Sequence, residues 1–370
     1  MAKYIYQHEN WTDFVWEEEK IRDLFGEVKY LQGRLNGILS AVGFSQKEET
    51  LLNTFTFDII KSSEIEGELL NYEQVRSSIA RCLGINTAGL VQSARHIEGV
   101  VEMMLDATQR YEKPLTEERL FGWHNALFPS GYSGVYKIDV ASYRKGEMQI
   151  VSGAMGKEKV HYEAVAAKNV KSEMDKFLTW INHESEVDAL LKAAIAHFWF
   201  IIIHPFDDGN GRIVRTITDM LLARAEKNSQ RFYSLSSQIL AQKKNYYEVL
   251  QKVQWSADSN ITDWLLFFLD CMKNALLYSE QTTSQVLLKT IFWNKHERTP
   301  INERQRLMLN KLLDGNFIGK LQSSKWAKIC KCSQDTAIRD IKDLIKKGIL
   351  QPEEGGGRST SYKIVDVTAP

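Results

Sequence analysis

The segment HPFDDGNGRIVR, residues 204–215, follows directly after the apolar run AHFWFIII. Because Pro205 has no N–H group and disfavours helix in the residue before it, the apolar helix is expected to end near His204. The Gly-Asn-Gly run at 209–211 can adopt the left-handed conformations of a tight loop, after which a second helix is expected. The segment therefore predicts a short loop between two helices, the first of them buried.

The residue types of this loop point to phosphate chemistry. The N-terminus of the second helix offers free N–H groups and the positive end of a helix dipole, which together bind phosphate. Arg212 and Arg215 share one side of that helix and can hold phosphate oxygens, while Asp208 can hold a phosphate-bound Mg²⁺. His204 titrates near neutrality, as a general base requires. A lone histidine at a helix end is more often a core residue, but the joint spacing favours a site.

Composition indicates a soluble globular protein of two or three units. The chain has 370 residues, of which 44% are hydrophobic and 25% charged. Lys plus Arg and Asp plus Glu both number 47, so no global field favours nucleic acid or acidic lipid. The N-terminus lacks the apolar region of a secretory signal, and no apolar run is long enough for a membrane span, so a cytoplasmic location without membrane contact is expected. Cys330 and Cys332 form a lone C-x-C, which favours ordinary thiols over a metal site.

Helical periodicity dominates most of the chain, and a mainly α fold is expected. The segment around 128–164 is rich in glycine and β-branched residues and predicts loops with a short hairpin at about 143–151. A capping box is expected at Thr116. The predicted helices cover residues 11–42, 48–60, 72–83, 93–108, 116–127, 165–183, 188–203, 211–225, 237–253 and 262–279. We expect an N-terminal helical region (1–110), a catalytic core (111–280), a linker helix (281–300) and a C-terminal domain (301–370).

The C-terminal domain reads as a winged helix-turn-helix. Two helices precede an amphipathic helix at 333–347, which occupies the recognition position, and two strands follow around a GGGRST tip. The side chains that could face a DNA duplex are Gln334, Thr336, Arg339, Lys342 and Arg358. Acidic residues interrupt this face, so a protein-docking or dimerising module remains an alternative.

The segment at 204–215 matches, position for position, the signature H-x-F-x-(D/E)-G-N-(G/K)-R-x-x-R of the Fic family. The surrounding text WHNALF, YRKGEMQIVSG and EMDKFLTWIN agrees with that context. The chain therefore resembles a Fic-family protein adenylyltransferase, with a Fic-type helical core, a β-hairpin flap and a C-terminal winged helix. The resemblance implies transfer of AMP from ATP, with Mg²⁺, to a Tyr, Thr or Ser hydroxyl of a target protein.

The resemblance also implies a role for each residue of the signature. His204 would deprotonate the target hydroxyl, and Asp208 would hold Mg²⁺ on the phosphates. The amides of residues 209–211 (Gly209, Asn210 and Gly211) would receive phosphate oxygens, and Arg212 and Arg215 would hold the polyphosphate. Phe206 is expected to anchor the loop, and Asp207 to be solvated.

Other parts of the chain match further sites of the family. Tyr246, Tyr247 and Gln254 stand where relatives contact adenosine, although relatives often have Asn in place of Gln254. The flap that pairs with an extended target segment would comprise Gln149, Ile150, Val151, Ser152 and Gly153. Relatives commonly follow this flap with a proline pair, which VHYEA replaces here.

The stretch SSEIEGE resembles the inhibitory motif of Fic proteins through Ser62, Glu66 and Gly67. Glu66 would pair with Arg215 and occupy the guanidinium that ATP needs for its γ-phosphate. Taken alone, such a pattern is usually a solvated helix face that ends at glycine.

Two further function classes stay open. The same fold could transfer a phosphate or another nucleotide, or the winged helix could make the chain a DNA-binding regulator. A homodimer is a possible assembly.

Overall fold

The computed structural model describes residues 4–40, 43–85, 89–152, 159–184, 186–256, 258–313, 317, 319–353 and 360–365. The chain divides into two compact units, one of residues 1–36 and 43–279 and the other of residues 37–42 and 280–370. Helices α1 (Glu18–Ser40) and α11 (Thr262–Lys295) each contribute residues to both units.

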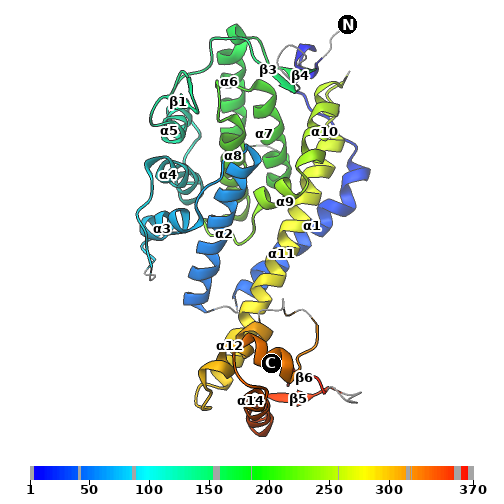
Figure 1. The fold of residues 1–370 in the computed structure, drawn as a ribbon. Coiled ribbons are helices and arrows are strands. Elements are labelled where there is room, and N and C mark those ends of the chain that lie inside the picture. The colour runs from blue at the N-terminus through cyan, green and yellow to red at the C-terminus, as the bar shows by residue number, and fades with distance from the viewer. Residues whose placement is uncertain are drawn as a thin grey trace. The chain divides into compact units, whose positions relative to one another are not determined.

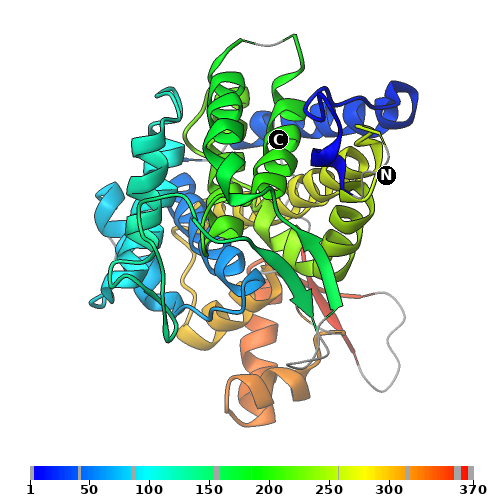
Figure 2. The ribbon, with the colours of Figure 1, turned by 90° about the horizontal axis from the view of Figure 1, so that it is seen from above.

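The larger unit is a body of α-helices with two small hairpins, so the prediction of a mainly α-helical fold is confirmed (Figures 1 and 2). Besides its parts of α1 and α11, its elements are η1 (Ile5–Gln7), α2 (Phe44–Ile65), α3 (Tyr72–Leu83), α4 (Arg95–Gln109), α5 (Glu117–Leu127), β1 (Tyr132–Ser133), β2 (Tyr136–Lys137), β3 (Gln149–Ser152), β4 (Lys159–Glu163), α6 (Ala167–Asn182), α7 (Ala189–Ile203), α8 (Asn210–Glu226), α9 (Leu235–Ala241) and α10 (Lys243–Gln254).

Helices α7 and α8 form the centre of this unit and pack against each other (Figure 1). Asp188 caps α7 by accepting a hydrogen bond from the Leu190 N–H at 2.8 Å. All residues from 193 to 203 are buried, as expected of a helix that is apolar on every side. The helix ends where the sequence predicted, and the loop of interest therefore starts from a rigid, buried support.

Helix α2 packs against α8 and α9 and is held there by a buried ion cluster. Arg231 lies 3.2 Å from Asp58 of α2 and also contacts Asp219 of α8, and the three side chains are at most 2% exposed. Burial raises the pKa of Asp219 well above its ordinary value, although the Arg231 charge opposes the shift. Because a buried ion left without its partner is costly, this cluster fixes the C-terminal half of α2 against α8.

The longer hairpin lies further along the chain than the predicted range 143–151. Strand β3 begins at Gln149 and pairs antiparallel with β4, with Gln149 opposite Glu163 (Figure 2). The segment VHYEA, which replaces a proline pair, supplies most of β4, and Tyr162 anchors it by donating to the Ile202 carbonyl at 2.7 Å. Gly153 lies outside the described residues.

Three other sequence predictions need correction. The helix predicted at 237–253 is two helices, α9 and α10, separated at Gln242, whose side-chain amide donates to Asp270 at 3.0 Å. Thr116 caps α5 through the Arg119 N–H at 3.2 Å, but Arg119 stands where a capping box needs an acid. Helix α11 continues to Lys295, through most of the expected linker helix.

The smaller unit contains α12 (Glu303–Leu313), α13 (Ser323–Ile329), α14 (Gln334–Lys346), β5 (Leu350–Pro352) and β6 (Tyr362–Ile364). Met308, Trp326 and Ile341 are buried at its core. Ser333 caps α14 by accepting from the Thr336 N–H at 3.2 Å. Among the described residues, no helix has both the length and the apolar character that crossing a membrane requires.

Candidate functional site

The loop between α7 and α8 is shaped by two residues in the left-handed region. His204 ends α7 with φ 50° and ψ 62°, and Gly209 precedes α8 with φ 80°. A side chain at Gly209 would lie 2.8 Å from the Phe128 ring, so glycine is required there on two grounds. The Asn210 side chain closes the loop by accepting from the Phe206 N–H at 3.0 Å and donating to its carbonyl at 2.7 Å.

The loop is also anchored from below. Phe206 is fully buried, as expected, and its ring stacks on the buried His124 imidazole with a 4.3 Å centroid distance. Arg144, which is 2% exposed, donates to the His204 carbonyl at 2.8 Å, and its own N–H donates to the Pro205 carbonyl at 2.9 Å. His124 and Arg144 were not predicted as site residues, although they lie in the segments WHNALF and YRKGEMQIVSG.

His204 is held as a neutral imidazole. Burial lowers the pKa of His204 to about 4, so the prediction that it titrates near neutrality is wrong; the hydrogen bond to Ile201 opposes this shift, and the nearby Arg144 charge adds to it. Its Nδ1 lies 3.3 Å from the Ile201 carbonyl. Because a carbonyl only accepts, Nδ1 carries the proton, and Nε2 has the free lone pair that a proton acceptor needs.

Arg215 is buried, and its guanidinium bonds to the C-terminal end of α2. It donates to Ser62 Oγ and to the Ser62 carbonyl, both at 2.8 Å, and to Glu66 Oε1 at 2.7 Å. Its side chain is 2% exposed and that of Glu66 32%. A Cβ atom on Gly211 would lie 1.9 Å from Glu66 Oε1, so the carboxylate rests directly on the first turn of α8. The predicted Glu66–Arg215 contact is therefore present.

Arg212 has an acidic partner that the sequence analysis missed. Its Nη1 donates to Glu68 Oε2 at 2.6 Å, and its guanidinium lies 5.1 Å from the centre of the Phe128 ring. Gly67, with φ 84°, turns the chain after α2, and the Glu68 N–H donates back to the Ser63 carbonyl at 3.0 Å. This glycine turn directs Glu68 back toward α8.

The two acids of the loop are both held by the chain at 131–139. Ser133 Oγ donates to Asp208 Oδ2, and the Gly209 N–H donates to Asp208 Oδ1 at 2.6 Å. The Asp139 N–H donates to Asp207 Oδ2 at 3.0 Å. The prediction that Asp207 is solvated is therefore incomplete, because its carboxylate also ties the loop to Asp139. The Gly209 amide, predicted to bind phosphate, is engaged by Asp208 in this state.

Two cavities meet at the loop. One, of about 660 Å³, is lined by His204, Asn210 and Gly211 together with the predicted adenosine contacts Tyr246, Tyr247 and Gln254. The other, of about 770 Å³, is lined by Glu68, Ser133 and Arg212 and by residues 127–130. Glu66 and Asp208 line both, so these two carboxylates stand at the junction.

Tyr246 and Tyr247 differ in their surroundings. Tyr247 is 44% exposed, whereas Tyr246 is buried and its hydroxyl donates to His197 Nε2 at 3.0 Å. His197 Nδ1 in turn lies 2.9 Å from Thr218 Oγ1, which already donates to the Val214 carbonyl. Tyr246 therefore offers its ring, and not its hydroxyl, to the cavity.

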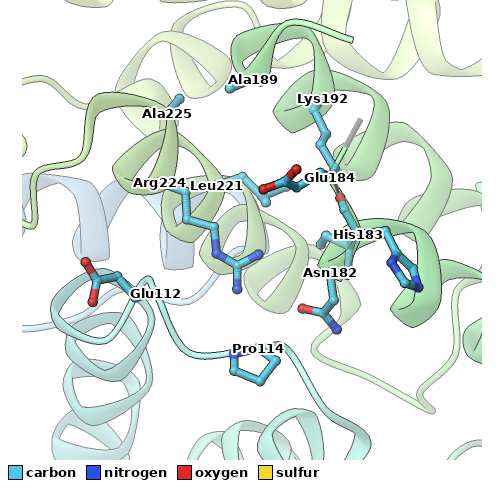
Figure 3. A pocket seen from close by; sticks show the side chains of 11 residues that line it. Glu112, Pro114, Asn182, His183, Glu184, Ala189, Lys192, Leu221, Arg224 and Ala225 are labelled. Atoms are coloured by element: carbon cyan, nitrogen blue, oxygen red, sulfur yellow. Dashed lines mark hydrogen bonds between the residues drawn. The ribbon is translucent and has the colours of Figure 1, made fainter. Parts of the chain in front are cut away.

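A further cavity, of about 420 Å³, lies at the opposite end of α7 and α8. Figure 3 shows Arg224 and Lys192 there, with Asn182 and His183 from the end of α6. Arg224 donates to the Lys113 carbonyl at 2.6 Å and contacts the Tyr111 carbonyl, and Lys192 contacts the His183 carbonyl. Both cations therefore bind backbone carbonyl groups. Because α7 is roughly 20 Å long, this cavity is separate from the loop at 204–209.

Residues 114–222 match the model of the Fic/DOC family, and residues 4–85 match a model described as a domain of unknown function (DUF4172). The chain contains a Fic/DOC family domain. This Fic domain includes the loop at 204–215, whereas Ser62 and Glu66 lie within the other match.

Among curated relatives, a protein adenylyltransferase fic-1 from Caenorhabditis elegans is 33% identical over 66 residues, which are 17% of this chain and 13% of the relative. The protein adenylyltransferase Fic from Culex quinquefasciatus is 30% identical over 105 residues, 28% of this chain and 19% of the relative. The chain thus spans a fifth or less of the length of these relatives.

The fold also resembles a solved structure. The crystal structure of a Fic family protein from Desulfovibrio desulfuricans G20 superposes with a TM-score of 0.53 and 20% identity, covering 95% of this chain and 97% of that chain. At this identity the likeness concerns the fold alone.

The buried imidazoles make stability depend on pH. Burial lowers the pKa of His124 to about 4 and that of His197 to about 3, against about 6.5 in an unfolded chain. The unfolded state therefore binds more protons below pH ~6.5, and stability is lost as pH falls through this window, by up to about 1.4 kcal/mol per pH unit for each group. Urea unfolding between about pH 7 and about pH 5 should show the decline. The variant His183→Ala, which removes an exposed imidazole, should follow the parent, and a flat profile would contradict the burial argument.

Proposed function

We propose that the protein transfers AMP from ATP to a hydroxyl group of a target protein, on a Tyr, Thr or Ser side chain. The observation that carries this proposal is the placement of the His204 imidazole, which lines one cavity with Asn210 and Gly211 of the first turn of α8 while its Nδ1 is held by the Ile201 carbonyl. The named relatives of the Fic domain are protein adenylyltransferases, which supports the same reaction class.

In the proposed reaction, His204 Nε2 accepts the proton of the target hydroxyl while Nδ1 stays bonded to the Ile201 carbonyl. The hydroxyl oxygen bonds to the α-phosphorus of ATP, the bond from that phosphorus to the bridging oxygen of the β-phosphate breaks, and pyrophosphate leaves. A positioned general base contributes typically ~10²–10⁴-fold to such a step. The tight anchoring of the loop by Arg144 and Phe206 supplies the alignment that the attack needs.

Phosphate binding is assigned to the start of α8. The amides of Asn210 and Gly211, the positive end of the helix dipole and the two arginines would offset the charge that develops on the phosphates. The Gly209 amide would join them once its bond to Asp208 opens. Asp208 with Ser133 presents a carboxylate and a hydroxyl, a donor set that suits Mg²⁺ carried by ATP. The described residues hold no group of three or more Asp, Glu, His or Cys side chains fit for a resident ion.

The remaining contacts follow the same cavity. Tyr246 and Tyr247 would pack against adenosine, and Gln254, which is 3% exposed and lines the cavity, would offer an amide. The flap at 149–152 would pair with an extended segment of the target by β-augmentation. Its edge brings the target hydroxyl toward His204.

We infer that the resting chain is inhibited by its own N-terminal region. The Glu66 carboxylate occupies Arg215 and rests on Gly211, where an incoming polyphosphate would need both groups. ATP would then bind with its α-phosphate out of line for attack. The ion cluster of Asp58 and Arg231 holds α2 in this position.

Glu68 gives this inhibition a second contact, through Arg212. The variant Glu68→Gln should raise AMP transfer by a few-fold, less than a change at Glu66, because Glu68 is 36% exposed and an exposed pair contributes about 1 kcal/mol or less. Initial rates with saturating ATP and Mg²⁺ provide the measurement. The matched control is Glu64→Gln, which removes a carboxylate that pairs with Lys61 on the same turn. Equal rates for Glu68→Gln and the parent would refute the second contact.

For the smaller unit we propose a winged helix whose helix α14 faces a partner, with DNA as the first class to test. Gln334, Arg339 and Lys342 are exposed on α14, whereas Thr336 is half-buried beside Ser333. Asp340 is bound by Arg304 at 2.8 Å and so does not repel a phosphate backbone as a free charge would. Arg358 lies outside the described residues. Binding to duplex DNA that weakens steeply with added salt would support this assignment.

The experiment that tests the proposed function is incubation of the protein with labelled ATP and Mg²⁺, alone and in a cytoplasmic lysate. Intact-mass spectra should show targets, or the chain itself, carrying added AMP on a hydroxyl side chain. Addition of phosphate would instead select the phosphotransferase alternative, and absence of any added group with Glu66 removed would reject transfer altogether.

A further inference from the structure

The hairpin of β1 and β2 brings a hydroxyl group against the carboxylate that faces the phosphates. Ser133 Oγ donates to Asp208 Oδ2 across 75 residues of sequence. The other oxygen, Oδ1, is taken by the Gly209 N–H at 2.6 Å. The Asp208 carboxylate is therefore held in one orientation, with Oδ2 directed at Ser133.

The chain around Ser133 is built to hold this contact. Ser133 pairs with Tyr136 across the hairpin, and Gly134, with φ 56°, forms the turn. The Ile138 N–H closes the segment 131–138 by donating to the Gly131 carbonyl at 3.1 Å. The Asp139 N–H donates to Asp207 at 3.0 Å. Two separate hydrogen bonds thus hold the segment 131–139 against Asp207 and Asp208.

The pair faces the cavity that is also lined by Arg212, one of the arginines proposed to bind phosphate. Ser133 and Asp208 line the 770 Å³ cavity together with Arg212, whose side chain is 9% exposed and whose Nε finds no hydrogen-bond partner within the described part of the chain. A single carboxylate is a weak site for Mg²⁺, which takes oxygen ligands from one or two carboxylates, from phosphates and from water. In P-loop enzymes a serine or threonine hydroxyl supplies one of these oxygens.

We propose that Ser133 Oγ is a direct ligand of the Mg²⁺ that accompanies the nucleotide, beside Asp208. The proposal rests on the proposed function, which supplies the metal-bound nucleotide. In the resting chain the Ser133 hydroxyl donates a hydrogen bond to Asp208, and metal binding would replace that hydrogen bond by two oxygen–metal contacts. A hydroxyl that only orients Asp208 would never touch the metal, and the test separates the two roles.

The test measures nucleotide binding, not transfer. ATP affinity of the full chain is determined by calorimetry over a Mg²⁺ titration, for the parent and for Ser133→Ala. The variant should need about tenfold more Mg²⁺ for half of the metal-dependent gain in affinity. Its affinity for ATP without metal should equal that of the parent. Ser130→Ala is the matched control, because Ser130 is an exposed hydroxyl on the same cavity wall, and it should titrate as the parent does.

The variant Ser133→Cys distinguishes a ligand from an orienting group. Sulfur binds the softer Mn²⁺ and Cd²⁺ better than Mg²⁺, so these metals should restore the affinity gain in Ser133→Cys but not in Ser133→Ala. A Mg²⁺ titration of Ser133→Ala identical to that of the parent would overturn the proposal. So would a cysteine variant that follows the alanine variant with all three metals. A chain that shows the expected metal switch but never transfers AMP would refute the proposed reaction and leave the ligand assignment standing.

Discussion

His204→Ala is expected to lower the rate of AMP transfer by ~10²–10⁴-fold, the range that a general base contributes, while ATP still binds. In the proposed reaction the imidazole accepts the proton, whereas the phosphate contacts would come from α8 and its arginines, which the substitution leaves in place. Single-turnover transfer assays measure the rate, and calorimetry measures ATP affinity. Because the substitution is best seen in an active background, both assays should be repeated with Glu66→Gly present.

The matched control is His183→Ala, which removes an exposed imidazole at the end of α6. It should transfer AMP at the parental rate. The base assignment is wrong if His204→Ala labels targets as fast as the parent, or if it loses transfer only because it no longer binds ATP.

Glu66→Gly should raise AMP transfer, on the order of 10- to 100-fold, which corresponds to about 1.4–2.8 kcal/mol of barrier. The substitution frees Arg215 and clears the space above Gly211, so that the polyphosphate can take the productive position. The gain should appear first as modification of the chain itself. Because Arg215 is 2% exposed, the variant should also lose some stability until ATP supplies a new partner.

The double variant Glu66→Gly with Arg215→Ala separates inhibition from other effects of the glycine. Removing Arg215 should cancel the gain, since the group that Glu66 blocked no longer exists. Glu64→Gln, two residues before Glu66 and in the last turn of α2, should leave the rate unchanged. Equal activity of the parent and Glu66→Gly, with ATP and Mg²⁺ in excess, would return Glu66 to the role of an ordinary helix-end residue.

The sequence was most informative where local rules dominate. The end of α7 at Ile203, the loop and the start of α8 follow from Pro205, from the glycines and from the apolar run before them. The division of 237–253 into α9 and α10 could not be read from periodicity, because the apolar spacing continues across Gln242. At that break the Gln242 side chain is bonded to Asp270, which lies 28 residues further along the chain.

Parts of the candidate site depend on such distant contacts and escaped prediction for the same reason. Ser133, Arg144 and Glu68 reach the loop from segments 60 to 144 residues away. None of these segments has a spacing that identifies its partner. Glu68 was within the quoted stretch SSEIEGE, but only the turn at Gly67 shows that it returns to Arg212.

The central claim, that the α-phosphate moves with its nucleoside to a protein hydroxyl, is tested most directly with two labelled forms of ATP. The Glu66→Gly variant is incubated with Mg²⁺ and with ATP labelled either at the α- or at the γ-phosphate, and protein-bound label is counted. We expect label from the α-position only, and none when His204 is also replaced by alanine. Protein label from the γ-position, or α-label that persists without His204, would contradict the account.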